Sequence, residues 1–597
     1  MVRHGACCEG HVTILNELRA AGPAGLLRDL GAALAVTFMA VPQGIAYALI
    51  AGLPPITGLY AAAVPTIVGS LFRSSRHVIS GPTNAVSLLV GGGVARVSLE
   101  LGMEPSLVAV QLALIVGLMQ AGAGVLRLGS VVDYISRPVV LGYITGAGVL
   151  IGVGQLPNMT GTAGGGSDLP SQLWSWFGGL GELTALPLVV GLLSAVAIVG
   201  LRRWDTRIPG TLLALGLATV ANVVFDLHAM GLRELGDLSS VPVGAPPLTL
   251  PGWPSFGLVS LAAAATVLSL VEASAVSRSL ADTTGDRVDA SREFLGQGLS
   301  NLAAAFTGGY PVSGSLARSR LNHEAGAQTR MAGVFSGLLV LGVLLFAGPI
   351  VERTPVAALA GSLMVVARDL VDTRRLRMVL HAALGDKVAL VATVLGTWVL
   401  PLDRAIYLGV AISIALFVRR ASLLIVRELR VDPAGRLREV KPGKGASCDL
   451  VTVLHVEGPL FFGAAAELRH ALEEAAHRPA LQVLVVRVKR TQGLDATCMD
   501  VLANAAKALR ERGQTLLLVG MRPPAMERLQ ATGVADRIGP QNLFPTREGW
   551  FVAMDQALDR ALELSSPHRP ECELSRYLAL RRGTALAPDS TNPSEPS

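Results

Sequence analysis

The sequence predicts a polytopic α-helical membrane domain followed by a small α/β domain, and three observations support this fold class. The 597 residues are 51% hydrophobic and only 16% charged, whereas soluble domains average about 25% charged residues. Between residues 32 and 426, apolar windows recur that are about 20 residues long, the length that crosses a bilayer. Beyond residue 427, charges become frequent and the apolar runs shorten to strand length.

The membrane domain contains apolar stretches that we interpret as membrane spans. They are Ala32–Gly52, Ile56–Phe72, Ser106–Leu126, Tyr134–Gln155, Ala185–Leu201, Gly210–Phe225, Leu258–Ser277, Ser291–Thr307, Ala332–Ile350, Val356–Val371, Lys387–Leu400 and Ile406–Val426. Two further pieces, Thr83–Val94 and Ser315–His323, are too short to cross alone. Basic clusters at Arg127, at 202–203 and at 374–377 mark the predicted cytoplasmic side.

The chain divides into five predicted parts. They are a cytoplasmic N-terminal leader (1–28), the membrane domain (29–428), a basic linker (429–446), the α/β domain (447–563) and a disordered tail (564–597). Both termini are predicted to be cytoplasmic, because the α/β domain follows a basic run. The start of the chain lacks the apolar core of a cleaved signal peptide. The five cysteines form no CxxC pair, so we expect neither a metal site nor a cofactor, and no basic stripe indicates nucleic-acid binding.

The two short pieces begin alike, with "ISGPTNAV" at 79–86 and "VSGSLARS" at 312–319. Each has a Ser-Gly pair that breaks the helix before a short helical run. Paired, interrupted segments in corresponding halves of a membrane protein indicate a central binding site, because broken backbone at that depth must be buried or line a cavity. The alternative is a pair of loops without function.

Two helix N-termini that meet would form an anion site. Each offers free N–H groups and about half a positive charge. Thr83 and Asn84 add hydrogen-bonding side chains at the first, and Ser315 and Arg318 add a hydroxyl and a guanidinium at the second. Arg320 lies about 200° from Arg318 around a helix, so we expect it to face a polar partner or water. The alternative for Arg318 is a side chain that snorkels to the membrane interface.

Three further polar residues lie within apolar spans. Pro42 is predicted to interrupt the first span, and Gln43 and Tyr47, four residues apart, share one helix face. Glu272 lies far from either end of its span, where an ionisable group is costly and indicates function. It could carry a proton or pair with Arg318. The alternatives are a structural kink with an interfacial tyrosine, and a glutamate that only neutralises a neighbouring cation. A cap at Asp289 or Ser291 is predicted to start the next helix.

These stretches together resemble the sulfate permease (SulP) family of anion transporters. The resemblance rests on "VPQGIAYALIAGLPPITGLYAA", "SSRHVISGPTNAVSLLV", "DTTGDRVDASREFLGQGLSNLAAAFTGGYPVSGSLARSRLNHEAGAQTRMAG" and "EGPLFFGAAAELR". It implies fourteen segments in two inverted seven-segment repeats, a core and a gate that move in an elevator-like manner, a C-terminal STAS domain and a homodimer. It also implies the site residues, which are Gln43, Tyr47, Thr83, Asn84, Ala85, Ser315, Leu316, Ala317, Arg318 and the acid Glu272.

The resulting hypothesis is a secondary transporter of a small anion in the bacterial inner membrane, with sulfate taken up together with protons, and not an enzyme. The alternatives are Na⁺-coupled bicarbonate uptake, C4-dicarboxylate uptake, a channel-like conductor and a membrane-anchored regulator. STAS-type domains carry a phosphorylatable residue in a turn that matches "GLDATCMDVL" here. Asp495 and Thr497 remain in that turn, while Ala496 and Cys498 depart from the pattern. A structural role for the turn is therefore the first interpretation, and phosphorylation of Thr497 the second.

Overall fold

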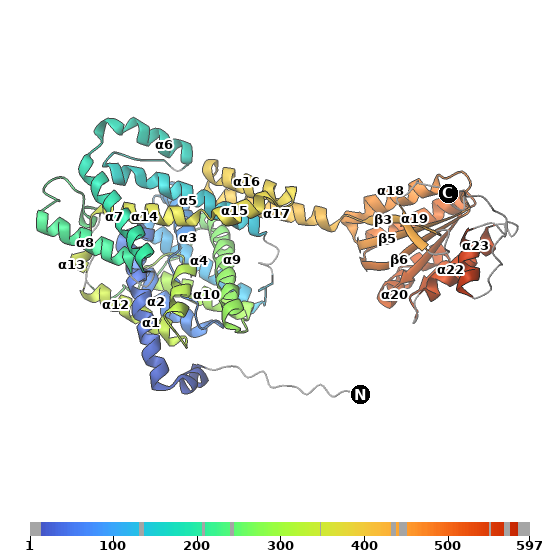
Figure 1. Cartoon of the computed structure of the whole chain (residues 1–597), viewed down its shortest axis with the longest axis horizontal. Helices are drawn as coiled ribbons and strands as arrows, with labels where there is room; N and C mark the ends of the chain where they lie inside the picture. The colour runs from blue at the N-terminus through green and yellow to red at the C-terminus, as the bar shows by residue number, and fades with distance from the viewer. Residues whose placement is uncertain are drawn as a thin grey trace, which may run out of the picture. The chain divides into compact units, whose positions relative to one another are not determined.

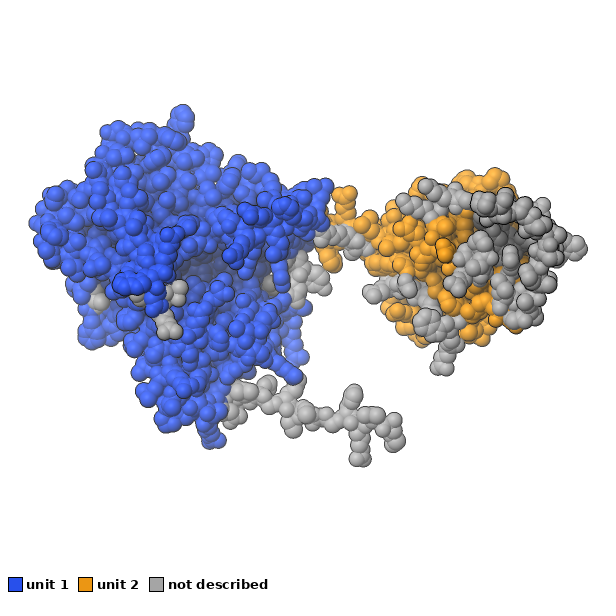
Figure 2. Space-filling model, viewed as in Figure 1, with its two compact units in different colours: residues 1–414 blue, residues 415–597 orange. Residues whose placement is uncertain are grey.

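The structure is a computed structural model that describes residues 14–130, 136–166, 168–205, 209–238, 244–346, 348–431, 437–440, 450–547, 551–565 and 573–582. The chain forms two compact units, Met1–Ile414 and Ala415–Ser597 (Figure 2). The first unit is helical and the second combines strands with helices (Figure 1). The predicted fold class is therefore confirmed.

Fourteen helices of the described residues correspond to the predicted spans and short pieces (Figure 1). They are α1 (Ile14–Ile50), α2 (Pro55–Phe72), α3 (Asn84–Leu101), α4 (Pro105–Val125), α5 (Arg137–Thr160), α7 (Ala185–Trp204), α8 (Gly210–Phe225), α9 (Val259–Thr284), α10 (Ala290–Phe306), α11 (Leu316–Glu324), α12 (Met331–Phe346), α14 (Val356–Leu370), α16 (Leu384–Val399) and α17 (Leu402–Ala421). Three short helices connect them: α6 (Leu169–Gly178), α13 (Gly348–Glu352) and α15 (Thr373–Leu380). Six described helices are long and apolar enough to cross a membrane alone.

The membrane helices pack in two groups. Helices α1–α4 and α9–α12 form the first, which we call the core group, with the closest packing between α4 and α10 and between α2 and α12. Helices α5, α7, α8, α14 and α16 form the second, the gate group, in which α14 packs against α5 and α7. The order along the chain alternates between groups, so each is assembled from both halves of the sequence.

Residues 14–28 of the predicted leader are helical and belong to α1, which is kinked at Gly22 before it continues to Ile50. One expectation about this helix is wrong. Pro42 lies inside this helix and does not interrupt it, and the non-helical backbone inside α1 is at Gly22. Proline removes a single N–H, and a membrane helix tolerates this when its neighbours satisfy the freed carbonyl.

The boundary between the units also differs from the predicted one. Helix α17 ends at Ala421, strand β3 (Ile425–Val431) starts before the predicted linker and runs into it, and β4 (Leu437–Val440) lies within it. Strand β3 pairs antiparallel with both β4 and β5 (Val451–Leu460). Within β3 the apolar Leu429 and Val431 share one face and are buried, whereas Glu428 and Arg430 share the other, so the frequent charges of this strand suggested a linker.

The second unit contains a six-stranded sheet with the order β4-β3-β5-β6-β7-β8. Strands β5, β6 (Val483–Leu494), β7 (Thr515–Met521) and β8 (Leu543–Pro545) are parallel. Parallel strands need crossover helices, and the structure has α18 (Ala465–Ala476), α19 (Ala496–Glu511), α20 (Pro523–Ala531) and α21 (Val534–Ile538) between them. Two further helices follow, α22 (Val552–Leu564) and α23 (Glu573–Arg581), the second within the predicted disordered tail.

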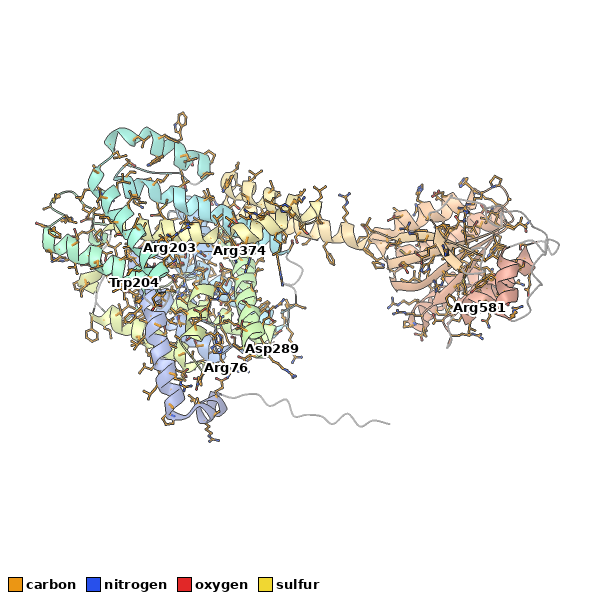
Figure 3. The ribbon with its side chains drawn as sticks, viewed as in Figure 1. Arg76, Arg203, Trp204, Asp289, Arg374 and Arg581 are labelled. Carbon is orange, nitrogen blue, oxygen red and sulfur yellow. The ribbon has the colours of Figure 1, made fainter. Side chains whose placement is uncertain are left out.

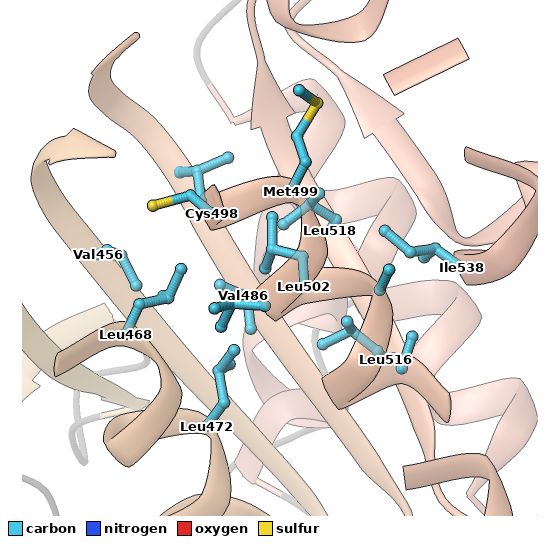
Figure 4. Packing of buried hydrophobic residues seen from close by; sticks show 14 of the residues in the cluster. Val456, Leu468, Leu472, Val486, Cys498, Met499, Leu502, Leu516, Leu518 and Ile538 are labelled. Carbon is cyan, nitrogen blue, oxygen red and sulfur yellow. The ribbon is translucent and has the colours of Figure 1, made fainter. Parts of the chain in front are cut away.

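Both faces of this sheet are covered by apolar side chains. On one face, Leu468 of α18 and Leu502 of α19 pack against Val486 of β6 and Leu518 of β7 (Figure 4). On the other face, Leu558 of α22 belongs to a separate buried cluster with the strands. A sheet buried on both faces has strands that read as continuous apolar runs, and "LQVLVVRV" and "TLLLVG" fit that rule.

Candidate functional site

The starts of α3 and α11 are joined through their backbones. Strand β1 (Ser80–Gly81) precedes α3, strand β2 (Ser313–Gly314) precedes α11, and the two pair antiparallel. Because each strand leads directly into its helix, α3 and α11 leave the pairing in opposite directions. The Ser315 N–H donates to the Ile79 carbonyl at 2.9 Å, and the Ile79 N–H donates to Ser319 Oγ at 2.9 Å. The two predicted helix starts are therefore hydrogen-bonded to each other. We call the pairing of β1 with β2, together with the first residues of α3 and α11, the crossing.

The start of α3 uses its side chains differently from an ordinary cap. Thr83 is the residue before the helix, but its hydroxyl makes no capping bond and instead donates to Glu272 Oε2 at 2.9 Å. Asn84 Oδ1 accepts the N–H of Ala85 at 2.8 Å. The first four N–H groups of a helix have no partner within it. An incoming anion would compete with Asn84 for one of these donors.

The first turn of α11 has exposed side chains on one side and buried side chains on the other. Ser315 caps the helix and accepts the Arg318 N–H at 3.5 Å. The side chains of Leu316 and Ala317 are exposed, whereas Arg318 is only 1% exposed. Arg320 points elsewhere, forming an exposed ion pair with Glu324 at 3.9 Å. The predicted separation of the two arginines is thus confirmed.

The Arg318 guanidinium reaches across to the first half of the sequence. Its Nη2 donates to the Pro82 carbonyl at 2.5 Å, while Nε is buried without a partner. The guanidinium lies against Gly81, where a Cβ would be 2.5 Å from Nη1. Gly81 has φ = 148°, a backbone conformation that glycine adopts freely. An arginine buried this deeply does not snorkel to a membrane interface.

Glu272 and Arg318 have different hydrogen-bond partners in this structure. Glu272 accepts from Thr83 and Arg318 donates to Pro82, and the ion pairs among the described residues do not include these two together. Tyr47 of α1 is buried and lies within electrostatic range of both charges. Three of the predicted residues, one from each of three helices, therefore gather near the crossing.

Gln43 lies one turn before Tyr47 on α1. Its Oε1 atom is buried and has no hydrogen-bond partner. An unsatisfied buried amide oxygen is costly in a finished core. It therefore marks a position at which a ligand or water molecule would complete the hydrogen bonding.

Two tyrosines near the crossing were missed by the sequence reasoning. The Tyr310 hydroxyl lies 3.0 Å from Ser87 Oγ, and Tyr310 is within electrostatic range of Arg318. The Tyr143 hydroxyl of α5 donates to the Ala85 carbonyl at 3.5 Å. Both are buried. The available signal was a tyrosine beside glycine in a stretch that is otherwise apolar, because a buried tyrosine needs a hydrogen-bond partner.

The loop before β1 is anchored to the start of α10. Glu293 Oε1 accepts the N–H groups of Ser74 and Ser75 at 2.9 and 2.6 Å. Arg76 pairs with Asp286, and Asp289, which caps α10 as predicted, donates its N–H to Ser74 Oγ at 3.0 Å. Arg76 and Asp289 lie at the same end of the first unit (Figure 3). The approach to the crossing is therefore held by polar contacts, of which the one between Glu293 and Ser75 is buried.

The predicted turn in the second unit is a helix cap. Asp495 Oδ1 accepts the Cys498 N–H at 2.9 Å and Oδ2 accepts the Phe462 N–H at 2.6 Å. Thr497 is exposed in the first turn of α19. Burial, and then the charge of Asp495, raises the pKa of the Cys498 thiol to about 12. Cys498 is therefore an inert thiol and not a nucleophile.

One group of residues in the second unit has metal-ligand chemistry. The ligand atoms of Glu439, His455 and Glu457 lie within 4.8 Å of one another. The guanidinium of Arg487 lies 3.4 Å from both ring nitrogens of His455. A fixed positive charge at that distance opposes a cation, so this arrangement favours an ion-pair network over a metal site.

Comparisons with known proteins agree with this architecture. The profile of the Sulfate permease family matches residues 26–393, and that of the STAS domain matches residues 447–549. YvdB of Bacillus subtilis is 29% identical over 87% of this chain and 96% of its own length, and its name assigns sulfate transport provisionally. Sulfate transporter 4.1, chloroplastic, of Arabidopsis thaliana is 25% identical over 90% of this chain and 80% of its own.

Solved structures share the fold at low sequence identity. The murine anion transporter Slc26a9 superimposes with a TM-score of 0.82, at 19% identity, over 92% of this chain and 94% of its own. The transmembrane domain of the cyanobacterial bicarbonate transporter BicA superimposes with a TM-score of 0.57, at 21% identity, over 64% of this chain and 97% of its own. The chain thus belongs to the sulfate permease family of anion transporters, and it carries a STAS domain after its membrane domain.

Proposed function

We propose that this protein is a secondary active transporter that takes up sulfate together with protons. The observation that carries the proposal is the antiparallel crossing, which brings the starts of α3 and α11 and the Arg318 guanidinium to one place. Two helix N-termini and a guanidinium provide positive potential and N–H donors, and the acid beside them is Glu272, which accepts the Thr83 hydroxyl. Sulfate as the anion rests on the names of the curated relatives.

The anion would lie between the two helix starts. On the α11 side, the N–H groups of Leu316 and Ala317 are first-turn donors beside exposed side chains. On the α3 side, the Thr83 and Asn84 side chains and the Ala85 N–H provide further groups. Gln43 and Tyr47 of α1 would close the site. Arg318 would supply its unpartnered Nε edge and its charge.

Glu272 would be the proton carrier. Its carboxylate already accepts the Thr83 hydroxyl, so it lies beside the proposed anion position. Two negative groups held close together repel, and protonation of one of them relieves the repulsion. A bound divalent anion would therefore favour the protonated carboxyl, and anion and proton would move together. This is the physical basis of symport in the proposal.

Movement of the core group relative to the gate group would carry the anion across the membrane in an elevator-like manner. The crossing and Glu272 belong to the core group, and the gate group contributes Tyr143 at the boundary. We further propose a homodimer in the bacterial inner membrane with the STAS domain in the cytoplasm. The coupling ion and the anion remain separate hypotheses, with Na⁺-coupled bicarbonate uptake, C4-dicarboxylate uptake and channel-like conduction as the alternatives.

Uptake by the purified full-length protein in proteoliposomes tests the function. Labelled sulfate, bicarbonate and fumarate would be offered with an imposed pH gradient, with an imposed Na⁺ gradient and with neither. We expect sulfate to accumulate above its external concentration only with the pH gradient. Accumulation driven by the Na⁺ gradient would reject proton coupling in favour of Na⁺ coupling. Equilibration without accumulation would favour a channel.

For the STAS domain we propose that Thr497 is a regulatory phosphorylation site. Its exposure in the first turn of α19 makes the hydroxyl accessible, and a phosphate there would be stabilised by the helix N-terminus. Phosphopeptide mapping of the protein from its native cells is the test. A map that covers residues 496–510 and contains no phosphate would contradict the proposal.

A further inference from the structure

We infer that residues 17–29, which we call the N-terminal brace, position the anion site from a distance. The brace is the part of α1 that precedes the first apolar span. It contacts the loop 325–330, which connects α11 to α12. The inference rests on the proposed function, because its effect is exerted on the half-helix that carries Arg318.

The first contact is made by Asp29, whose side chain is fully buried. Asp29 Oδ1 accepts the N–H groups of Gln328 and Thr329 at 2.7 and 3.1 Å, and Oδ2 accepts the Thr329 hydroxyl at 2.5 Å. Hydrogen bonds to an ionised carboxylate are about twice as strong as neutral ones. One side chain of α1 therefore fixes two successive backbone groups of the loop.

The second contact is a buried ion pair between Glu17 and Arg330. Glu17 Oε1 lies 3.1 Å from both Nε and Nη2 of Arg330, and the two side chains are 5% and 3% exposed. A buried charge left without its partner is strongly unfavourable. The pair therefore holds the first turns of α1 against the residue that precedes α12.

The backbone between these two contacts is bent by a specific glycine. Gly22 has φ = 61° and ψ = −172° inside an otherwise helical segment, and Pro23 follows it. Non-glycine residues adopt that conformation only at a substantial cost. The bend separates the turn that carries Glu17 from the turn that carries Asp29. The sequence "AAGPAG" thus encodes the shape of the brace.

The loop that the brace fixes is the far end of α11. This helix has nine residues, and at its start the Ser315 N–H is bonded to the Ile79 carbonyl. At its end, the Ala327 N–H bonds back to the Asn322 carbonyl, immediately before the residues that Asp29 holds. A nine-residue helix that is held at both ends can tilt very little. The orientation of Arg318 therefore depends on the brace.

Two alanine variants of glycines in the same helix test this inference. Gly22→Ala strains the bend, although a Cβ there would meet no other atom within 4 Å. Gly31→Ala is the matched control, because Gly31 has equally open surroundings and helical backbone. Sulfate uptake in proteoliposomes gives KM and Vmax for each, and thermal unfolding gives Tm. Misplacing a positioning group by about 1 Å can cost up to about 100-fold, so we expect KM to rise at least about tenfold in Gly22→Ala, with Vmax retained.

The split between KM and Vmax separates positioning from general stability. A variant that only loses folded protein has a lower Vmax and an unchanged KM, and this outcome would overturn the inference, as would an equal effect of Gly31→Ala. Asp29→Asn, which keeps one acceptor oxygen, is the second variant and is expected to raise KM in the same way if Gly22→Ala does not fold. Absence of uptake by the wild-type protein would instead reject the proposed function.

Discussion

The Arg318 guanidinium lies so close to Gly81 that a Cβ there would be 2.5 Å from Nη1, so an arginine of α11 meets a glycine of the strand that precedes α3. The contact joins residues that are far apart in the sequence, and it leaves no room for a side chain at residue 81. It also makes Gly81 a part of the site, although it has no functional group.

We predict that Gly81→Ala abolishes anion uptake. The added Cβ would lie 2.5 Å from Arg318 Nη1, and the backbone at φ = 148° would be strained by any side chain. Uptake of labelled sulfate by the purified variant is the measurement. Gly92→Ala in α3 is the control, because the nearest atom to a Cβ there is 3.5 Å away. Normal uptake by Gly81→Ala would show that Arg318 does not need its observed position.

The second prediction concerns Arg318 itself. Arg318→Ala removes the guanidinium from the crossing, and we expect sulfate affinity to fall at least about tenfold, since charge-assisted hydrogen bonds contribute about 1.5–3 kcal/mol each. Binding is measured by titration of the purified variant with sulfate. Arg320→Ala, which removes only an exposed ion pair, is the control. Equal sulfate affinities of Arg318→Ala and the wild type would contradict the hypothesis that Arg318 is an anion ligand.

The third prediction concerns coupling. Glu272→Gln keeps a hydrogen-bond acceptor for the Thr83 hydroxyl but cannot exchange a proton. We expect this variant to equilibrate sulfate across the membrane without concentrating it when a pH gradient is imposed. The measurement is uptake with the gradient and after its collapse by an uncoupler. Accumulation that still follows the pH gradient would assign the proton to another group.

The fourth prediction concerns the stability of the STAS domain. Burial alone would raise the pKa of Glu428, but the hydrogen bonds and charges of Arg478 and Arg430 hold it below its ordinary value. A depressed carboxyl pKa contributes stability above the unfolded pKa, about 4.3, and this contribution is lost as the pH falls through the folded pKa.

Glu428→Gln should therefore unfold at a lower temperature than the wild type at pH 7, with a loss of about 1.5–3 kcal/mol because two partly exposed arginines lose a charged hydrogen-bond partner. The difference in Tm should shrink when both proteins are measured near pH 4. Circular dichroism of the full-length protein follows the transition. A difference that is the same at both pH values would mean that the charge of Glu428 is not the source of its contribution.

Much of the site could be predicted because its signals are local. The Ser-Gly pairs before 82 and 315, the depth of Glu272 and the angular separation of Arg318 from Arg320 are all properties of short stretches. The cap at Asp289 is also local. What the sequence did not reveal depends on contacts between distant segments, such as the pairing of Ser80 with Gly314, the bond from Arg318 to Pro82 and the position of Tyr143 beside Ala85.

The errors have the same origin. Proline and charge were interpreted as breaks, so Pro42 was expected to interrupt a helix, and residues 429–446 were assigned to a linker although part of this stretch forms strands. In the structure, neighbouring elements satisfy these groups. Arg330 pairs with Glu17, and Arg430 pairs with Glu428, which lies two residues earlier on the same face of β3. Whether a polar residue ends an element depends on a partner that a single stretch of sequence does not reveal.

The pairing of β1 with β2 has a consequence for biosynthesis. The two strands are separated by more than half of the membrane domain, so β1 is made long before its partner. Until residue 314 leaves the ribosome, β1 and α3 are in the membrane without β2, the strand that pairs with β1. A nascent chain arrested before β2 would therefore contain most of the membrane helices but no assembled site. The backbone groups of β1 would need another partner, either in the translocation machinery or in the helices already made.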